Sequence, residues 1–481
     1  MVFNNMYILR MFIIYFSEFC MLYTIGINIF YNGQMLIASL DMFSYLRKMK
    51  ASDYKRYIDS KNMIPISIIV PAYNEEKTIV DNIKSLLALN YFEYEIIIVN
   101  DGSTDFTKEK IINEFNLKKV NQPIMQSLPT NEVAGIYRSN QYERLIFVDK
   151  LNGGKADALN AGINVSVYPI FACIDADSIL ENDALIKLTM LFVENPETIA
   201  VGGIVRIANG SIIKDGKLME MNIPKSNMAK FQIIEYFRAF LTGRTSFSKL
   251  NSILIISGAF GAFNKRVVIE CGGYKVNTIG EDMDIIVRLH KAMKDQKRKY
   301  KIQFLADPIC WTQAPETMKD LRSQRRRWQI GLFDTLISYR RMLFNPKYGK
   351  IGMVTLPYYW IFELIGPIVE ALGYIFIPLA YLFGLLAFDS FITFFVIAFL
   401  LGTTLSMGSI LLEQITFRKY SSLKETLLLV LFGVLENLGY RQLTVLFRVE
   451  GIFNFRRGRH SWGAMNRKKF VSSKEKKEND K

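Results

Sequence analysis

Two aspartates, Asp175 and Asp177, follow the short apolar run 171–174 and lie at an expected chain reversal. Carboxylate oxygens at this spacing suit Mg²⁺ or Mn²⁺, which use one or two carboxylates together with substrate phosphates. The alternative is a solvated turn at the end of a strand, because aspartate is a common turn residue. Taken alone, the D-x-D motif favours the turn. A metal site therefore needs support from a nucleotide site, a base and an acceptor path elsewhere in the chain.

Two polar motifs follow two other predicted strands. Pro71, Tyr73 and Glu75 come directly after the β-branched run 64–70, and Asp101 follows the run 95–99 within Asn-Asp-Gly. Carboxylates at such strand ends can accept hydrogen bonds from a uracil N–H or from ribose hydroxyls. The same types of residue also cap helices, so each motif alone is compatible with both interpretations.

Glycines mark two further places where the backbone could approach a ligand. Gly153, Gly154 and Lys155 begin a predicted helix, where backbone amides and an ammonium group could approach phosphate oxygens. The alternative there is a plain glycine turn with a solvated lysine. Gly258, in the apolar stretch 254–263, could face an acceptor or could serve core packing alone.

Glu281 and Asp282 open another predicted helix, and Gln324, Arg327 and Trp328 form a Q-x-x-R-W motif. The carboxylates could cap the helix, or one could be the base that an attacking sugar hydroxyl needs. The later motif spans about one and a half helical turns. Its Trp and Gln could bracket an acceptor sugar, and its arginine could pair with a diphosphate. A basic amphipathic helix at a membrane surface is the alternative.

Strands and helices alternate around these motifs. We predict strands at 64–70, 95–99, 144–149, 169–174 and 200–206, and helices at 75–89, 155–164, 231–241 and 285–292. Strand–helix–strand units of this length form parallel sheets, whose carboxyl ends collect ligands. The polar stretch 106–142 is predicted to be a surface excursion with a helix near 108–115. No G-x-G-x-x-G follows the first strand, which argues against a dinucleotide-binding dehydrogenase.

Apolar residues gather near both ends of the 481-residue chain. Residues 11–46 carry only two charges, Glu18 and Asp41, and are long enough for one membrane-spanning helix. The stretches 357–388, 391–412 and 426–447 form a second apolar block. Together they indicate an integral membrane protein. Four scattered cysteines and two histidines suggest neither a zinc site nor a disulfide framework.

The net charge of +15 is concentrated beside the apolar stretches. Residues 454–481 contain ten Lys and Arg against three Asp and Glu, and Lys and Arg also crowd 47–56, including Lys55 and Arg56. By the positive-inside rule we expect both clusters in the cytoplasm, and no nucleic-acid partner. An even number of crossings must then separate the middle domain from the tail. Either 357–388 crosses twice in a bent pair, or one of the three stretches does not span.

The ordered motifs resemble those of the processive, membrane-embedded family 2 glycosyltransferases. This family includes cellulose, chitin and hyaluronan synthases and, closest in layout, bacterial poly-N-acetylglucosamine synthases. The resemblance covers 64–328 by motif and the flanking helices by architecture, and several motifs in one order are far more specific than any one. The set is Tyr73 with Glu75, Asn100-Asp101-Gly102, Lys155, Asp175-Ala176-Asp177, Gly280-Glu281-Asp282 and Gln324-Arg325-Arg326-Arg327-Trp328.

The chain departs from the cellulose-synthase pattern at two points. It has Gly280 where that pattern has threonine, and no PilZ-like domain follows the last apolar stretch. Direct control by cyclic di-GMP through an attached domain is therefore not expected.

The resemblance implies an α/β fold of the GT-A type, which is Rossmann-like with a mostly parallel sheet, plus membrane helices. It implies inverting sugar transfer from a UDP-sugar, with UDP-N-acetylglucosamine favoured, and Mg²⁺ or Mn²⁺ as cofactor. Asp101 would bind the uridine, and Asp175 and Asp177 would hold the metal and diphosphate. Asp282 would be the base. The remaining assignments are donor contacts by Pro71, Tyr73, Glu75, Lys155 and Arg327, and acceptor contacts by Gln324, Trp328, Glu281 and Gly258.

We therefore expect a multi-pass plasma-membrane protein with a cytoplasmic catalytic domain that extends a β-linked polysaccharide and couples synthesis to export. Its partners would be the UDP-sugar, the growing polymer, membrane lipid and accessory export or regulatory proteins. The alternatives are single-sugar transfer to a lipid or carrier acceptor, and an inactive subunit that only binds nucleotide sugar. The expected segments are a membrane helix and basic exit (1–50), a catalytic domain (60–330), an interfacial amphipathic segment (331–353), membrane helices (354–450) and a basic tail (451–481).

Overall fold

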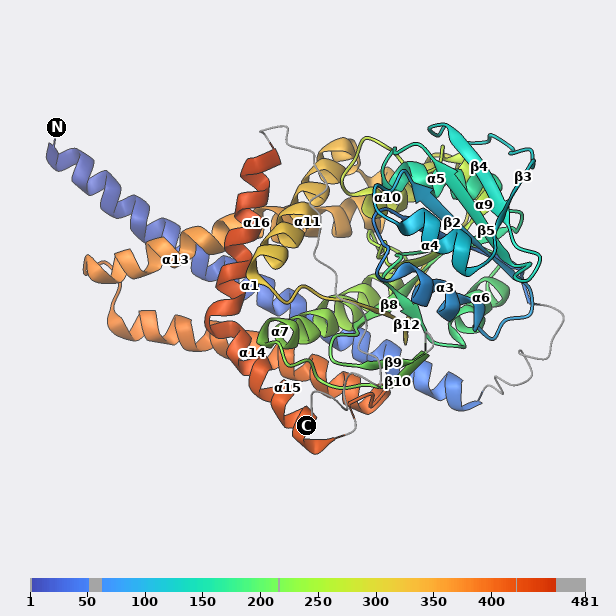
Figure 1. Cartoon of the computed structure of the whole chain (residues 1–481). Coiled ribbons are helices and arrows are strands. Elements are labelled where there is room, and N and C mark those ends of the chain that lie inside the picture. The colour runs from blue at the N-terminus through green and yellow to red at the C-terminus, as the bar shows by residue number, and fades with distance from the viewer. Residues whose placement is uncertain (1, 52–62, 215–216, 421, 456–481) are drawn as a thin grey trace.

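The computed structural model describes residues 2–51, 63–214, 217–420 and 422–455. A sheet-based domain forms one end of the molecule and long helices form the other (Figure 1). The N-terminal half of α1 (Val2–Ala51) projects away from the rest, as does the hairpin of α13 (Gly366–Leu382) and α14 (Phe388–Thr416). The predicted combination of an α/β domain and long apolar helices is confirmed.

The sheet-based domain is built on ten strands in the order β3-β4-β5-β2-β1-β6-β11-β8-β12-β7. Strands β5, β2, β1 and β6 run parallel, and β11 lies antiparallel between β6 and β8. The predicted parallel arrangement is therefore confirmed. The strands are β1 (Ile66–Ala72), β2 (Tyr94–Asp101), β3 (Lys118–Val120), β4 (Val133–Arg138), β5 (Leu145–Lys150), β6 (Ile170–Ile174), β7 (Ile179–Leu180), β8 (Thr198–Ile207), β11 (Phe260–Asn264) and β12 (Lys301–Thr312).

The central strands lie where the sequence predicts them, with ends that differ by about two residues. Ile68, Ile69 and Ile97 are completely buried, since the middle of the sheet is covered on both faces. Near-continuous β-branched runs are typical of strands in such a position. A separate hairpin of β9 (Ile212–Lys214) and β10 (Lys217–Glu220) lies outside this sheet.

The prediction for residues 106–142 is only partly right. The helix α4 (Thr107–Glu114) lies where a helix is predicted, but β3 and β4 then extend the sheet at its edge. Strand β4 pairs antiparallel with β5, with Tyr137 opposite Phe147. Short, half-exposed strands give a weak sequence signal, because pairing with β5 is a tertiary contact rather than a local preference.

The helices of the domain differ from the predicted ones mainly at their ends. Residues 75–78 form a turn, closed by the Thr78 N–H donating to the Glu75 carbonyl at 3.1 Å, before α3 begins. The helix predicted at 231–241 is longer, because α7 continues through a π-helical segment (Phe237–Arg244) into α8. The helices are α3 (Ile79–Leu87), α5 (Lys155–Val165), α6 (Ala184–Glu194), α7 (Asn227–Tyr236), α8 (Thr245–Lys249), α9 (Lys265–Glu270) and α10 (Glu281–Asp295).

The Q-x-x-R-W motif lies on α11 (Met318–Ser338), which packs side by side with α16 (Arg441–Phe455) near the C-terminal end of the described chain (Figure 1). Gly451 allows this close packing, since a Cβ there would lie 2.9 Å from the Arg326 carbonyl oxygen. Short 3₁₀ turns (Arg340–Met342 and Pro346–Tyr348) connect α11 to the helical run Ile351–Leu382. The motif helix thus joins the sheet-based domain to the apolar helices.

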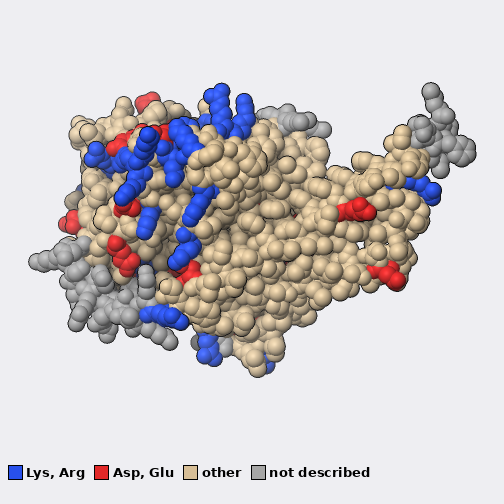
Figure 2. Space-filling model, turned by 180° about the vertical axis from the view of Figure 1, so that it is seen from behind, with Lys and Arg blue, Asp and Glu red and all other residues tan. Residues whose placement is uncertain are grey.

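Three helical runs in the described residues are long and apolar enough to span a membrane: Tyr7–Arg47, Ile351–Leu382 and Phe388–Thr416. Seen from behind, Lys and Arg side chains gather over the sheet-based end, whereas the projecting helices carry few charges (Figure 2). The apolar stretch 357–388 falls largely within the helical run Ile351–Leu382. It therefore forms one helical run rather than a bent pair of crossings.

The fourth apolar stretch, 426–447, differs from the others. It divides into α15 (Leu423–Leu435) and α16, with non-helical backbone at Leu438 and Gly439 between them. Glu436 at this break accepts from Arg238 of the sheet-based domain. This stretch is not among the candidate spans, so two candidate spans lie between the sheet-based domain and α15.

Two regions used in the charge argument lie outside the described residues. Lys55 and Arg56 fall within 52–62, and nearly all of the predicted basic tail falls within 456–481. The cytoplasmic placement of both clusters stays a prediction.

Candidate active site

A single cavity of about 1140 Å³ brings all of the predicted site residues together. Its wall starts at the carboxyl ends of β1, β2 and β6, passes the first turn of α10 and the motif face of α11, and continues between the apolar helices. The predicted residues that line it are Pro71, Tyr73, Glu75, Asp101, Lys155, Asp175, Asp177, Gly258, Glu281, Asp282, Gln324, Arg327 and Trp328.

Strand β6 ends directly before Asp175 and delivers the D-x-D motif to the cavity. The turn is real, because the Ser178 N–H donates to the Asp175 carbonyl at 3.0 Å, but both carboxylates still line the cavity. Burial, and after it the charge of Asp175, raises the pKa of Asp177 to about 7. Because the negative charges of Asp175 and Asp177 repel each other, a cation beside them would be stabilising.

Lys155 supplies one such positive charge. Its Nζ lies 2.5 Å from Oδ1 of Asp175, 3.8 Å from Oε1 of Glu281, and donates to the Gly258 carbonyl at 3.3 Å. Burial alone would lower the pKa of Lys155, but the carboxylates of Asp175 and Glu281 outweigh it and raise the pKa above its usual range. A Cβ on Gly258 would lie 2.8 Å from this Nζ, so the close approach needs glycine.

The expectation that the Gly153 and Gly154 amides bind phosphate is wrong. In the structure these N–H groups donate to the two oxygens of Asp101 at 2.9 and 2.7 Å. Lys150 Nζ adds a third contact to Asp101 at 2.6 Å. A carboxylate offers about four acceptor positions. Asp101 therefore fixes the glycine turn and keeps about one acceptor position, so its predicted contact with a uracil N–H stays a prediction.

The loops after β1 and β2 bind each other. Asn74 Oδ1 accepts from the Thr104 N–H at 2.8 Å, and Asp105 Oδ2 accepts from the Glu76 N–H at 3.2 Å. This cross-linking holds Pro71 and Tyr73 at the cavity wall, where the Tyr73 ring is 49% exposed and available to stack on a base. Glu75 is buried and its Oε2 accepts from the Thr78 hydroxyl at 3.0 Å.

The first turn of α10 carries Glu281 and Asp282. Glu281 is buried, which raises its pKa to about 7 against the opposing charge of Lys155. Asp282 is half-buried, and its Oδ1 accepts from the Met283 N–H at 2.9 Å. Asp282 is thus the more accessible of the two carboxylates, as a group that meets an acceptor hydroxyl must be.

The turn before α10 contacts α11 through backbone alone. A Cβ on Gly280 would lie 2.9 Å from the Gly331 carbonyl oxygen, and a Cβ on Gly331 would lie 3.0 Å from the Gly280 Cα. Real Cβ atoms are not found so close to backbone. The glycine that replaces threonine in the motif therefore sets how closely Asp282 approaches the Q-x-x-R-W helix.

On α11 the motif residues face the same cavity with different exposure. Gln324 is 7% exposed, and its Oε1 has no hydrogen-bond partner among the described residues. Trp328 is 45% exposed, and the Arg325 guanidinium lies 4.5 Å from the centroid of its ring. Arg325 itself donates to Glu235 at 2.8 Å. An exposed indole beside an unused amide oxygen can hold a sugar by stacking and hydrogen bonding.

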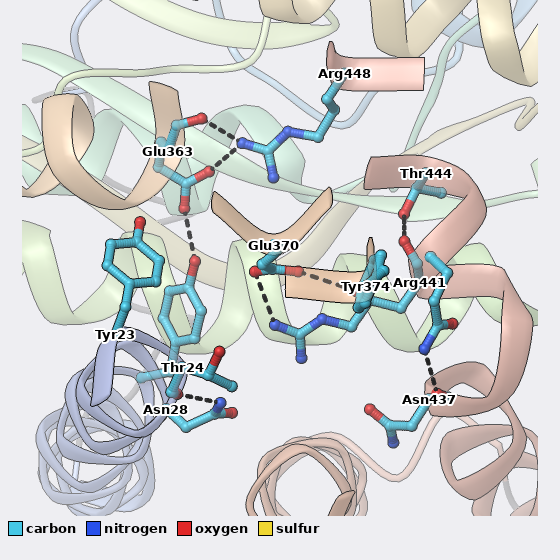
Figure 3. Close-up of polar contacts among 12 residues, drawn as sticks. Tyr23, Thr24, Asn28, Glu363, Glu370, Tyr374, Asn437, Arg441, Thr444 and Arg448 are labelled. Carbon is cyan, nitrogen blue, oxygen red and sulfur yellow. Dashed lines mark hydrogen bonds and ion pairs between the residues drawn. The ribbon is translucent and has the colours of Figure 1, made fainter. Parts of the chain in front are cut away.

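Beyond Trp328 the cavity continues along two ion pairs between the run Ile351–Leu382 and α16 (Figure 3). Arg448 donates to Glu363 at 2.9 Å, and Arg441 donates to Glu370 at 3.3 Å, so the carboxylates and the arginines each recur after seven residues. The Tyr31 hydroxyl from α1 donates to Glu363 at 3.1 Å. This part of the wall is polar although it lies among apolar helices.

The donor set of the D-x-D motif fits a hard divalent cation. No group of three or more His, Cys, Asp or Glu side chains in the described ranges could hold a metal ion. A cation on Asp175 and Asp177 would thus complete its shell with oxygens of a substrate or of water, as Mg²⁺ commonly does.

Several residues of the site were not predicted from the sequence. Lys150 follows directly after a predicted strand end, and its position beside Asp149 was the only local signal. Glu235 lies in a predicted helix, Glu363 lies in a predicted membrane span, and Arg244 lies in no predicted element. Only the tertiary fold brings the three to the cavity.

Two family descriptions match the chain. "Glycosyl transferase family 2" matches residues 67–272, and "Glycosyl transferase family group 2" matches residues 170–407. Among solved structures, a mannosyltransferase from Pyrobaculum calidifontis in complex with GDP-Man and Mn²⁺ aligns over 88% of this chain and 99% of its own, with a TM-score of 0.49 and 16% identity. Similarity at that level carries no functional argument.

Curated relatives are more similar. The chain is 31% identical over 324 residues to the poly-beta-1,6-N-acetyl-D-glucosamine synthase of Staphylococcus aureus strain COL, over 67% of this chain and 66% of the relative. It is 31% identical over 340 residues to the protein of the same name from Staphylococcus epidermidis, over 69% of this chain and 72% of the relative. The Q-x-x-R-W helix, the D-x-D turn and the GT-A-type sheet therefore belong together: this chain is a member of the family 2 glycosyltransferases.

Proposed function

We propose that this protein transfers N-acetylglucosamine from UDP-N-acetylglucosamine, with inversion, to the end of a growing β-linked polysaccharide. The observation that carries the proposal is the single cavity that joins Asp175, Asp282 and Trp328 to the polar wall at Glu363 between the apolar helices. A transferase that adds one sugar needs a donor pocket and an acceptor pocket. A continuous path from both into the apolar helices suits an acceptor that moves on after each addition.

The donor is proposed from two sources. Tyr73 at the mouth and the Lys155–Asp175 pair deeper in the cavity give a stacking surface and a charged site in the order that a nucleoside diphosphate needs. The printed names of the staphylococcal relatives favour N-acetylglucosamine as the sugar. Arg327 lines the same cavity and is proposed as a further diphosphate contact.

The transfer is a displacement at the anomeric carbon. Asp282 accepts the proton of the acceptor hydroxyl while that oxygen forms its bond to the anomeric carbon, and the bond from this carbon to the diphosphate oxygen breaks on the opposite face. Trp328 holds the acceptor sugar by stacking, and Gln324 orients it through the unused amide oxygen. Lys155 remains protonated and stays beside the leaving diphosphate.

A divalent cation, Mg²⁺ or Mn²⁺, would be held by Asp175 and Asp177. When bound, it supplies positive charge that stabilises the departing diphosphate. The charge of Asp175 helps to raise the pKa of buried Asp177, and a cation beside both would relieve this repulsion, which supports the assignment.

The proposed site of action is the cytoplasmic face of the plasma membrane. Two candidate spans follow the catalytic domain, and the predicted basic segments favour the cytoplasm for both flanks. Polymer extended at Trp328 would enter the polar wall at Glu363 and Arg448, so synthesis and export would use one path.

The proposal is tested with purified protein in lipid nanodiscs, UDP-N-acetylglucosamine and Mg²⁺. Long products are expected, and a product with one added sugar would instead support transfer to a lipid or carrier acceptor. Asp282→Asn is expected to lower turnover by a factor of about 10²–10⁴, the typical contribution of a general base, while UDP binding persists. Nucleotide binding without transfer by the wild-type protein would favour an inactive binding subunit.

A further inference from the structure

Arg244 lines the cavity and has no hydrogen-bond or carboxylate partner within the part of the chain that the structure describes. It ends the π-helical segment Phe237–Arg244, and its guanidinium carbon lies 3.8 Å from the centroid of the Phe240 ring. Its Nη1 is buried and has no hydrogen-bond partner among the described residues. Buried polar groups of folded proteins normally have partners, so an exception in a cavity wall points to a ligand.

Five other Lys and Arg side chains of the same cavity wall form ion pairs within the protein. Each of them contacts a carboxylate, whether it belongs to the catalytic domain or to the apolar helices. The pairs are Lys155 with Asp175 at 2.5 Å, Arg325 with Glu235 at 2.8 Å, Arg448 with Glu363 at 2.9 Å, Arg441 with Glu370 at 3.3 Å, and Arg238 with Glu436. The chain therefore provides a carboxylate for each of these five and, within the described residues, none for Arg244.

The groups that surround Arg244 include Asp282. Burial lowers the pKa of Arg244 to about 10, and the groups that oppose this effect are Tyr359, Asp282 and Tyr236. For Lys155 the corresponding groups are Asp175, Glu281 and Asp282. Asp282 is the group common to both, so its charge acts on Arg244 as well as on the cation beside the D-x-D motif.

Aromatic residues of the run Ile351–Leu382 lie beside the segment that carries Arg244. Phe247, one turn further along, packs its ring against Tyr358 and Tyr359 with centroid distances of 5.1 and 6.0 Å. The cavity continues past these aromatic residues to Glu363. The leaving diphosphate is assigned to the Lys155 side of Asp282. A ligand at Arg244 would thus lie beside the aromatic wall that leads to the apolar helices, the part of the cavity assigned to the acceptor.

We propose that Arg244 binds the acceptor polysaccharide by donating hydrogen bonds to neutral oxygens, the hydroxyls or the acetamido carbonyls, of its terminal sugars. This inference rests on the proposed function and adds an acceptor-binding residue outside the Q-x-x-R-W motif. A guanidinium presents five N–H donors in one plane, which suits several sugar oxygens at once. The Phe240 ring fixes that plane from one side. Arg244 takes no part in proton transfer.

The test compares Arg244→Met, which keeps length but removes the donors, with Arg244→Lys, which keeps the charge but loses the fork. The matched control is Arg266→Met, whose side chain is 88% exposed on the catalytic domain. Each full-length protein is assayed in nanodiscs with UDP-N-acetylglucosamine and short β-linked N-acetylglucosamine oligomers. The readouts are KM for the oligomer, KM for the donor, and UDP release without oligomer.

For Arg244→Met we expect the oligomer KM to rise about tenfold or more, the loss expected for hydrogen bonds to a charged group. The donor KM and the oligomer-independent UDP release of Arg244→Met should stay within about twofold of wild type. The oligomer KM of Arg244→Lys should lie between the values for wild type and Arg244→Met. A raised donor KM with an unchanged oligomer KM would overturn the inference and assign Arg244 to the diphosphate. An unchanged oligomer KM in both variants would also overturn it. If wild-type protein does not extend the oligomers at all, the proposed function itself fails.

Discussion

Substitution of Gly331 by alanine tests whether the backbone contact between α10 and α11 sets the geometry of the site. The new Cβ would lie 3.0 Å from the Gly280 Cα and 3.2 Å from its nitrogen, against an ordinary carbon–carbon separation of about 3.5–4.0 Å. Because both neighbours are backbone, the two helices must separate by a few tenths of an ångström. Trp328 would then move away from Asp282 by a similar distance. Misplacement of about 1 Å can lower a rate by about 10²-fold.

A shift of a few tenths of an ångström is smaller than this, so we expect Gly331→Ala to lower kcat by a factor of about 3–10, with an overpacking cost of about 1–3 kcal/mol in stability. Sugar transfer in nanodiscs measures the first, and thermal unfolding of the same sample measures the second. The matched control is Gly26→Ala, since a Cβ there meets nothing within 4 Å. Wild-type kcat in Gly331→Ala would refute the claim that this contact positions the acceptor platform.

Three further outcomes follow from buried charges and from the proposed cation. Lys150→Met removes the cation beside two carboxylates that are each less than 5% exposed, and should cost about 3–5 kcal/mol of stability in a thermal unfolding assay. The control is Lys108→Met, whose side chain is 36% exposed and which should cost less than about 1 kcal/mol in the same assay. Equal losses would contradict the buried-pair argument. Burial lowers the pKa of His290 from 6.5 to about 4, so stability should fall as pH decreases from 6.5 toward 4, by about 3 kcal/mol at most. A His290→Gln variant should show a shallower dependence of its unfolding temperature on pH, and an unchanged slope would remove His290 as the cause. Chelation of divalent cations should abolish transfer reversibly and leave the unfolding temperature of nucleotide-free protein unchanged, while full activity after chelation would exclude the proposed cofactor.

Local patterns in the sequence were sufficient for the parallel core of the sheet and for the polar motifs that line one cavity. Ile68 and Ile97 lie in β-branched runs whose burial on both faces leaves few other structures open to them. The polar residues that follow these runs had to meet, because parallel strands end at one edge. The interpretation of Gly153 and Gly154 failed for a related reason. Glycine turns present amides to any nearby anion, and the fold places the Asp101 carboxylate there first.

The strands β3 and β4 and the break at Leu438 could not be predicted in this way. Tyr137 is in a strand only because β5 offers it a partner, and no local preference announces that partner. Residues 426–447 are apolar enough to be grouped with the predicted membrane stretches, although Glu436, Asn437 and Arg441 make them the most polar of these. Glu436 nevertheless binds Arg238, and this long-range ion pair attaches the segment to the catalytic domain.

The sequence by itself determined the chemistry available to this protein. The sequence alone gives the identity and the order of Asp175, Asp177, Asp282 and Trp328, and with them the functional groups that can take part in a reaction. The tertiary structure decided which groups remain available for a ligand. Lys155 and Arg244 are both basic residues of one cavity, yet the fold pairs the first with a carboxylate at 2.5 Å, and among the described residues no carboxylate forms an ion pair with the second. Pairing of charges depends on distances between segments far apart in the chain, and only the folded arrangement sets those distances.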